Sequence, residues 1–264
     1  MDISFAHCDH INASRFVRSF WQIAGAPNYQ HETILPKGVV ELIFSFGDDV
    51  FFSKSIQTQP VGIPRCFVNG MNNIPIKLHT PRRQVFFGVE LHPAAVKKLL
   101  KVPCGEFLNA ITDLQLVNKE FNSLWQQLAE AGPFEQKVQL FQQWIIGKLC
   151  PVHEQEMAIS NFINETPEPV NVSTLAANFC YSSRQLNRKA QEIFGMSTEA
   201  LIRYKRYVHA LKIMHHTHET LTRISYHCNY YDQAHFIREF KEFTGLTPGE
   251  YRRQKGHLAG HIFQ

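Results

Sequence analysis

The chain has 264 residues, of which 44% are hydrophobic and 19% are charged. This length fits one large domain or two modest ones, and the composition is typical of a protein that buries a core. It excludes a disordered tail, a collagen-like fibre and a small disulfide-dense protein. No apolar run approaches the roughly 20 residues that span a bilayer, and the first residues do not resemble a secretory signal. We therefore expect no membrane partner and a cytoplasmic location.

The six cysteines are scattered along the chain and include no CxxC pair. In the absence of an export signal we expect them to be reduced and mostly buried. A structural zinc site would need two closely spaced pairs of ligands, and the histidines at 215–218 and 7–10 stand without a second pair. The sequence also contains no nucleophile elbow and no phosphate-binding loop. These patterns predict no metal, no cofactor and no catalytic residues.

The formal net charge of +4 is concentrated in one half of the chain. Residues 1–160 hold 14 basic and 14 acidic residues, whereas residues 161–264 hold 13 basic and 9 acidic residues. A neutral half joined to a basic half is typical of a partner-facing domain attached to a domain that faces a polyanion. Random surface variation gives the same balance, so charge alone leaves both interpretations open.

The first half reads as strands and then helices. Residues 33–91 hold short β-branched and aromatic runs separated by Gly, Pro and Asn, which predict a small β-barrel or sandwich. Residues 118–131 and 134–149 each place apolar side chains on one helical stripe, with a Gly-Pro break between them. This helical hairpin either covers the β domain or pairs with a second copy of the chain. In the second case Leu124 and Phe141 would lie in the contact of a homodimer.

The segment 166–169, Thr-Pro-Glu-Pro, is the clearest boundary signal. We predict an N-terminal domain over residues 1–152, β-rich and then helical, and a C-terminal all-α domain over residues 153–264. The predicted fold class is therefore α+β.

The C-terminal part contains one pattern twice, in residues 175–195 and 224–245. In each copy a short helix ends at a tight turn, and a polar N-cap (Ser182 or Asp232) starts a second helix. A glycine then ends this helix in a left-handed conformation. The pattern predicts two helix-turn-helix units, over about 172–195 and 221–245, whose second helices have the right shape for the major groove.

A helix over about 198–215, capped by Ser197, is predicted between the two units. At 1.5 Å per residue it is roughly 25 Å long. Such a rigid spacer could hold two reading helices about one DNA turn, ~34 Å, apart.

The residues of this module match a known pattern. The matching motifs are Leu175-Ala176, Arg184-Gln185-Leu186, Phe194-Gly195-Met196-Ser197, Tyr231 to Phe236, and Gly245-Leu246-Thr247-Pro248. From about Met157 to Lys255 the chain resembles the DNA-binding domain of the AraC/XylS family, and the resemblance covers the whole module. It implies sequence-specific transcriptional regulation, usually activation near a promoter. The implied partners are double-stranded DNA, bound at two adjacent major-groove segments, and RNA polymerase.

Two positions depart from the family pattern. Where members usually have glycine in the turns, this chain has Cys180 and Asn229. Asn tolerates the left-handed conformation, whereas Cys180 is expected to distort or strain the first turn.

The predicted DNA-binding residues lie on or just before the two second helices, on faces away from Leu186 and Phe236. Arg can bond guanine O6 and N7, Asn or Gln can bond adenine N6 and N7, and helix starts bind phosphate. The predicted set is Ser182, Ser183, Arg184, Asn187, Arg188 and Gln191 in the first unit, and Asp232, Gln233, Ala234, His235, Ile237 and Arg238 in the second. We expect direct base contacts from Arg184 and Asn187. Arg188 and Arg238 could instead contact phosphate or a carboxylate of the domain.

The N-terminal part resembles sensor domains attached to a subset of this family. The resembling segments are Ser19-Phe20-Trp21, residues 35–44, Phe67-Val68-Asn69-Gly70 and Phe87-Gly88-Val89. The resemblance implies a barrel that binds a small-molecule effector or mediates dimerisation. Candidate lining residues are Trp21, Phe44, Phe46 and Phe87, with Glu41 or Arg82 as polar anchors, although each of them also fits plain core or surface.

Two other functions stay open at this point. A DNA-repair enzyme or other enzyme fused to the DNA-binding module would need a reactive thiol in electropositive surroundings and a zinc cluster. A non-sensing architectural DNA binder would carry an inert β domain whose melting temperature no metabolite raises.

Overall fold

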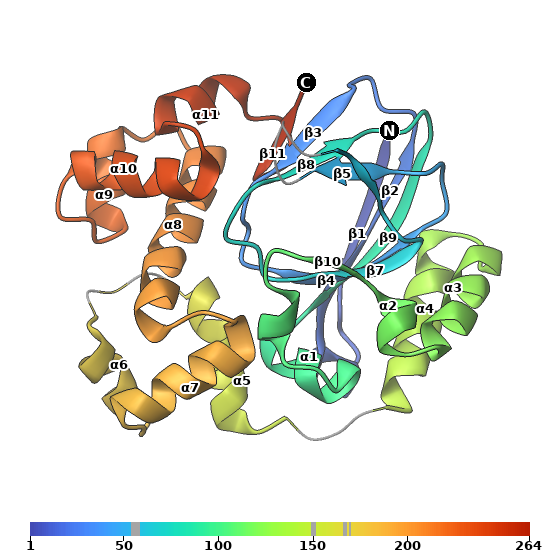
Figure 1. Cartoon of the computed structure of the whole chain (residues 1–264), viewed down its shortest axis with the longest axis horizontal. Coiled ribbons are helices and arrows are strands. Elements are labelled where there is room, and N and C mark those ends of the chain that lie inside the picture. The colour runs from blue at the N-terminus through green and yellow to red at the C-terminus, as the bar shows by residue number, and fades with distance from the viewer. Residues whose placement is uncertain (54–58, 149–151, 166–167, 169) are drawn as a thin grey trace.

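The computed structural model describes residues 1–53, 59–148, 152–165, 168 and 170–264. Three residues of the expected linker, Thr166, Pro167 and Pro169, lie outside the described residues, as does Cys150. Figure 1 shows the two β-sheets on one side of the molecule and the helices α6 to α11 on the other.

Two antiparallel sheets form the N-terminal part. The first sheet runs in the order β1 (Asp2–His7), β2 (Val17–Gly25), β9 (Gln84–Leu91), β4 (Val40–Ser45), β7 (Cys66–Asn69) and β10 (Ile111–Asp113). The second runs in the order β11 (His261–Phe263), β3 (His31–Ile34), β8 (Ile76–His79), β5 (Phe51–Ser53) and β6 (Val61–Gly62). The sheets stay separate, so the sandwich alternative is confirmed over a closed barrel.

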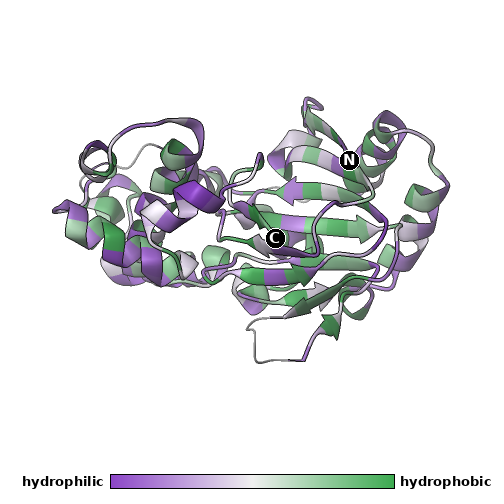
Figure 2. Ribbon diagram, turned by 90° about the horizontal axis from the view of Figure 1, so that it is seen from above, coloured by the Kyte–Doolittle hydropathy of each residue, from purple (hydrophilic) through white to green (hydrophobic). Residues whose placement is uncertain are grey.

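The strand alternation divides the apolar side chains of the first sheet between two cores. Ile43 and Phe86 point toward the second sheet, whereas their chain neighbours Phe44 and Phe87 lie on the opposite face among the helices. The rings of Phe44 and Phe141 are 6.2 Å apart. Successive side chains of a strand point to opposite faces, so each pair of adjacent residues serves both cores. Figure 2 shows hydrophobic residues interspersed with hydrophilic ones along both the strands and the helices.

The predicted helical hairpin consists of α3 (Glu120–Glu130) and α4 (Phe134–Ile146). Its apolar stripe packs on the first sheet of the same chain, where Leu124 and Phe141 are at most 1% exposed. The prediction that the hairpin covers the β domain is thus confirmed. The homodimer contact through Leu124 and Phe141 is wrong, because the chain's own sheet already buries both side chains.

Several shorter helices lie elsewhere along the chain before the C-terminal ones. They are η1 (Ala13–Arg15), α1 (Pro93–Leu100), η2 (Cys104–Phe107), α2 (Leu114–Val117), α5 (Glu154–Asn161) and η3 (Phe162–Asn164). The C-terminal helices are α6 (Val172–Asn178), α7 (Ser183–Phe194), α8 (Thr198–His216), α9 (Leu221–His227), α10 (Gln233–Thr244) and α11 (Pro248–Gln254). Within the described part of the chain, no helix has both the length and the apolar character needed to cross a membrane.

One strand contradicts the all-α prediction for the C-terminal part. After α11 the chain returns to the N-terminal sheets, where β11 pairs with β3 and brings His261 opposite Ile34. The buried side chain of Ile262, 2% exposed, holds the strand in place. A strand of three residues carries too little periodicity to be recognised in a sequence.

Candidate nucleic-acid interface and ligand pocket

The first candidate reading helix, α7, begins at a reciprocal cap. Ser182 Oγ accepts a hydrogen bond from the backbone N–H of Gln185 (3.2 Å), and Gln185 Oε1 accepts one from the backbone N–H of Ser182 (2.9 Å). This capping box satisfies two donors that a helix start otherwise leaves unpaired. The helix ends at Gly195, whose φ of 72° is left-handed. Both ends of α7 therefore follow from the sequence.

The second candidate reading helix, α10, has the same ends. Asp232 Oδ1 accepts a hydrogen bond from the backbone N–H of His235 (2.7 Å), and Gly245 ends the helix at a φ of 73°. A carboxylate at this position also interacts favourably with the positive end of the helix dipole. The two helices are thus built alike.

The turns that precede the two helices are also alike. Cys180 and Asn229 have φ values of 57° and 56°, in the left-handed region. The amide of Cys180 bonds the carbonyl of Ala177 (3.0 Å), and that of Asn229 bonds the carbonyl of Tyr226 (3.1 Å). Cys180 thus adopts the turn conformation that glycine usually takes, at a cost of about 1–2 kcal/mol for a side chain with a Cβ.

The apolar side of each reading helix is buried and the opposite side is exposed. Leu186 is 2% exposed and Phe236 is fully buried. Nine predicted residues are exposed: Ser182, Ser183, Arg184, Asn187, Arg188, Gln191, Asp232, Gln233 and Ala234. Arg238 is exposed too, while His235 and Ile237 are half-buried. The helices therefore present two polar faces that bear arginine.

Some of these side chains also have partners inside the domain. Asn187 Oδ1 accepts a hydrogen bond from the backbone N–H of Thr198 at the start of α8 (3.0 Å). Gln233 Oε1 accepts one from the hydroxyl of Thr222 (2.7 Å). The exposed Asn187 thus helps to position α8, a role that its spacing in the sequence does not predict.

The three arginines of the reading faces are not paired with carboxylates. Among the described residues, Arg184, Arg188 and Arg238 take part in no ion pair. Their charges therefore face solvent rather than a carboxylate of the domain. An unpaired exposed guanidinium keeps its five donors for an external acceptor.

The spacer helix α8 is fixed to the N-terminal sheets by two buried tyrosines. The hydroxyl of Tyr204 donates to the carbonyl of Asn72 (2.6 Å) and accepts from the backbone N–H of Gly38 (3.0 Å). The hydroxyl of Tyr207 donates to the carbonyl of Pro36 (3.1 Å). Burial raises the pKa of both phenols, so both stay protonated. The spacer thus has a defined position against the sheets.

The same helix holds α10 through a buried carboxylate. Glu239 is 2% exposed and accepts from Arg203 (2.9 Å) and Arg206 (3.2 Å) of α8. A buried carboxylate with two guanidinium partners orients the elements that carry them, because loss of either partner leaves an unpaired buried charge. This contact sets the position of the second reading helix on the spacer.

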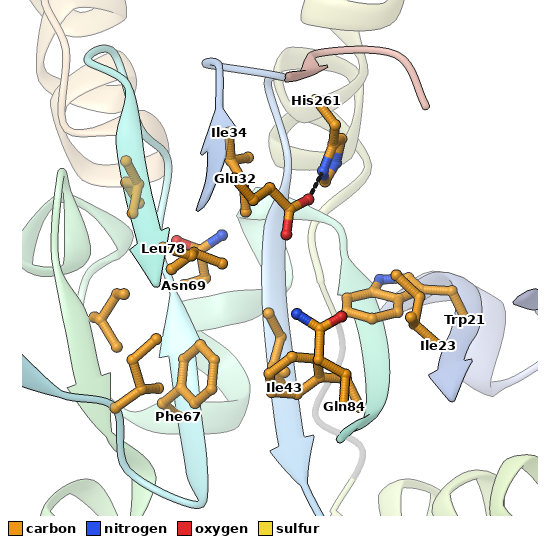
Figure 3. A pocket seen from close by; sticks show the side chains of 14 residues that line it. Trp21, Ile23, Glu32, Ile34, Ile43, Phe67, Asn69, Leu78, Gln84 and His261 are labelled. Atoms are coloured by element: carbon orange, nitrogen blue, oxygen red, sulfur yellow. Dashed lines mark hydrogen bonds and ion pairs between the residues drawn. The ribbon is translucent and has the colours of Figure 1, made fainter. Parts of the chain in front are cut away.

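A pocket lies between the two sheets (Figure 3). Its lining residues are Trp21, Ile23, Glu32, Ile34, Ile43, Ile63, Phe67, Asn69, Ile76, Leu78, Gln84, Phe86, Ile111 and His261. The indole of Trp21 lies against Gly88 of β9, where an added Cβ would be 2.0 Å from Trp21 Cε2. Glycine at this position therefore lets the indole form one wall of the pocket.

The candidate lining residues divide between the pocket, the core and the surface, the alternatives that the sequence leaves open. Trp21 lines the pocket, but Phe44 and Phe87 face the helices on the other side of the sheet. Phe46 packs against Trp125, with ring centroids 5.7 Å apart. Glu41 is not among the residues that line the pocket, although it accepts a hydrogen bond from Trp21 Nε1 (2.9 Å). Arg82 is exposed on the surface. The strand positions were foreseen, but the face that each side chain occupies was not.

Three buried cysteines do not resemble activated nucleophiles. Burial raises the pKa of Cys66 to about 11, and that of Cys104 and Cys228 to about 12. Raised pKa values keep these thiols protonated at neutral pH, whereas the nucleophile is the thiolate. In the part of the chain that the structure describes, no three metal-binding side chains lie together.

Comparisons with known protein families match two separate parts of the chain. Residues 175–254 match the family described as "Helix-turn-helix domain", and residues 12–113 match "Domain of unknown function (DUF6597)". The first match covers both units and the spacer helix between them. The second covers most of both sheets.

Two curated relatives are similar over the C-terminal part. The HTH-type transcriptional activator RhaS of Enterobacter sp. (strain 638) is 30% identical over 86 residues, 33% of this chain and 31% of that protein. The F1 operon positive regulatory protein of Yersinia pestis is 33% identical over 97 residues, 36% of this chain and 32% of that protein. The chain thus spans about a third of the length of these relatives.

A solved structure is similar over almost the whole chain. ToxT from Vibrio cholerae, with an unsaturated fatty acid bound, has 10% sequence identity and a TM-score of 0.51, covering 91% of this chain and 97% of that chain. This likeness shows that the two share a fold, with a β-rich N-terminal part and a helical C-terminal part. Within this shared fold, residues 175–254 are the part that matches the helix-turn-helix family.

Proposed function

We propose that this chain is a sequence-specific transcriptional regulator. Its N-terminal domain, residues 1–152, would bind a small effector, and its C-terminal domain, residues 153–264, would read DNA. The observation that carries the proposal is the pair of matching, capped helices with exposed arginines. Two reading helices on one rigid spacer suit two successive major-groove segments of a duplex.

The proposed reading residues fall into three groups. Arg184, Arg188 and Arg238 are exposed, form no ion pair with any described residue, and are the proposed contacts to guanine or phosphate. The helix starts at Ser182 and Asp232 are proposed to bind the DNA backbone through main-chain N–H groups. The other proposed contacts are Ser183, Asn187, Gln191, Gln233, Ala234, His235 and Ile237. Asn187 would contact a base through its amide nitrogen, because its oxygen already bonds Thr198.

Selection of DNA fragments by the whole protein tests this function. The selection is run at several stated salt concentrations, because phosphate contacts make affinity fall steeply with salt. We expect one enriched motif with two half-sites about one helical turn apart. The absence of any enriched sequence at low salt would overturn the proposal.

Arg184→Ala examines the role of one residue. We expect the binding free energy to weaken by about 1–3 kcal/mol and the preference at a single base pair to relax. Equal weakening on every sequence would instead show that Arg184 contacts phosphate. Arg82→Ala is the matched control, since Arg82 is an exposed arginine of the N-terminal domain; it should leave the binding unchanged.

The effector role is proposed from the pocket between the sheets and from the fold shared with ToxT, whose structure holds an unsaturated fatty acid. Thermal shifts with a metabolite panel test it, because a ligand that binds only the folded state raises the melting temperature. If no compound raises it, the architectural alternative is favoured. Homodimer formation and contact with RNA polymerase are further proposals, which sedimentation and a polymerase recruitment assay would test.

A further inference from the structure

The pocket between the sheets has a mainly apolar wall. Its floor and sides include the isoleucines at 23, 34, 43 and 76 together with Leu78 and two phenylalanines. The space is about 560 Å³ when the open solvent at its mouth is counted with it, so only a small molecule could enter. An occupant that fills it must therefore be small and largely apolar, because burial of apolar surface supplies most of the binding free energy.

One polar group of the wall lacks a partner. Gln84 is 2% exposed, and its Nε2 has no hydrogen-bond partner among the described residues. In Figure 3 its amide projects from β9 into the space between the sheets. A buried donor without an acceptor costs about 1–3 kcal/mol, so a ligand that brings an acceptor regains this free energy.

The other polar groups of the pocket already have partners. The Trp21 indole N–H and the Asn69 amide both donate to Glu41, at 2.9 and 3.2 Å. Glu32 Oε1 lies 2.5 Å from Nδ1 of His261, which comes from β11. Among the described residues that line the pocket, Gln84 Nε2 is therefore the one buried hydrogen-bond donor without an acceptor.

The charge of the pocket disfavours anions. Burial and the nearby Lys37 lower the pKa of His261, so its imidazole is neutral at pH 7. Lys37 Nζ lies 3.2 Å from His261 Nε2 and 3.9 Å from Glu41, outside the lining of this pocket. Glu32, 7% exposed, is thus the charged group that an occupant would meet. A carboxylate ligand would be placed beside this carboxylate in a region of low dielectric constant.

We propose that the pocket takes a small uncharged molecule with an apolar body and one hydrogen-bond acceptor, such as a ketone, ester or ether oxygen, which accepts from Gln84 Nε2. The proposal rests on the effector role given above and specifies the chemistry of that effector. Because His261 comes from β11, the occupant also touches the segment that follows the second reading helix.

Three probes of matched shape test the proposal on the full chain. They are cyclohexyl methyl ketone, cyclohexanecarboxylate and cyclohexylmethylamine, measured by calorimetry and by NMR at pH 7. The ketone should bind in the millimolar range or better, and the carboxylate should bind at least about tenfold more weakly, a difference of about 1.4 kcal/mol. Tightest binding of the carboxylate or the amine, or no binding of the ketone, overturns the proposal.

Two variants assign the roles of the side chains. Gln84→Leu should weaken the ketone about tenfold and leave ethylcyclohexane unchanged, since only the ketone uses the amide. Glu32→Gln should raise the affinity for the carboxylate. Gln126→Leu, at an exposed position of α3, is the matched control and should change neither. Equal ketone affinity in Gln84→Leu and the unaltered chain would rule out the amide as the recognition group.

These results are separable from the regulator function. DNA selection needs no ligand. If the chain selects a DNA motif but does not bind the ketone, only the proposed class of ligand is contradicted. If the chain binds the ketone through Gln84 but selects no DNA, the proposed class of ligand is supported and the proposed regulator function is contradicted. If Gln84→Leu melts earlier than the unaltered chain, the Glu32→Gln comparison still decides whether the pocket excludes anions.

Discussion

The two helix-turn-helix units share their caps, turns and end glycines, but their neighbours differ. Gly195 ends α7 against η2 of the N-terminal part: a Cβ on it would lie 2.7 Å from Gly105 Cα. A Cβ on Gly245, at the end of α10, would meet nothing within 4 Å. An ion pair between Lys97 of α1 and Glu192 adds to the first contact. The first unit is thus docked on the N-terminal part, whereas the corresponding end of the second is open.

The same local design thus serves two tertiary roles in one chain. The caps and left-handed residues set each unit's own shape, and they need only a few residues at fixed spacing. The contact of Gly195 with Gly105 depends instead on a backbone that is 90 residues away in the sequence. The equivalent glycines therefore have different requirements, which matched substitutions can separate.

The largest expected effect comes from Gly195→Ala compared with Gly245→Ala. Both replacements place a Cβ on a left-handed residue, which costs about 1–2 kcal/mol. Gly195→Ala must in addition separate α7 from Gly105, at about 1–3 kcal/mol for overpacking. Urea unfolding should therefore show a greater loss for Gly195→Ala. Equal losses would show that the first unit is not docked as described.

The second unit is tested through the strand that follows it. Ile262→Asp should detach β11 from β3 and lower the free energy of unfolding by about 2–3 kcal/mol, because a buried apolar side chain becomes a charge. Hydrogen exchange should speed up at the amides of His31 and Leu35, which bond the carbonyls of Gln264 and Gly260. Gln264→Asp adds the same charge at an exposed neighbour and should leave both measurements unchanged.

The spacer between the units is the third test. Tyr204→Phe leaves the carbonyl of Asn72 and the N–H of Gly38 without their buried partner, and should cost about 1–2 kcal/mol. Tyr207→Phe removes one bond, to Pro36, and should cost less. Tyr226→Phe, at a side chain that is 71% exposed, should be near neutral in thermal melts. A Tyr204→Phe chain as stable as the Tyr226→Phe chain would contradict the anchoring role.

The smallest expected effect is a pH dependence on the docked side of the molecule. Burial and then the charge of Arg18 lower the pKa of His92 to about 4, and Arg18 Nε donates to its Nδ1 (3.1 Å). In the unfolded chain this pKa returns to about 6.5. Between these values the unfolded chain binds a proton that the folded chain does not, so stability is full above pH 6.5 and falls as the pH drops toward 4. With allowance for solvent screening the loss is about 1 kcal/mol.

His92→Asn gives the control for this dependence. The Asn oxygen can accept from Arg18 but does not titrate. Urea unfolding at pH 7 and pH 5 should show a smaller loss for the variant than for the unaltered chain. An equal loss would place the acid sensitivity elsewhere.

Sequence patterns predicted the parts of the fold that depend on neighbouring residues. Local spacing predicts the N-cap of α7 at Ser182, the end of the helix at Gly195 and the exposed face that bears Arg184. The sandwich and the packing of α3 and α4 were predicted because alternation and helical stripes mark buried faces. These features need no information about which distant segments meet.

The parts that were not predicted depend on distant contacts. Phe86 and Phe87 are adjacent and equally apolar, and only the tertiary structure decides which of them faces the pocket. Gln84 and His261 carry no signal of their own, except that Gln84 is a polar residue at the start of an apolar strand. The sequence predicts a base contact for Asn187 but not its bond to Thr198, because a cap on a helix that starts 11 residues later is not a local pattern.

The return of β11 has a consequence for biosynthesis. Residue 262 pairs with residue 33, so the edge of the second sheet stays open on the ribosome until the helix-turn-helix units have been translated. An open strand edge is a template for unwanted pairing between nascent chains. Closure of that edge therefore makes the final assembly of the two sheets depend on synthesis of the C-terminal helices.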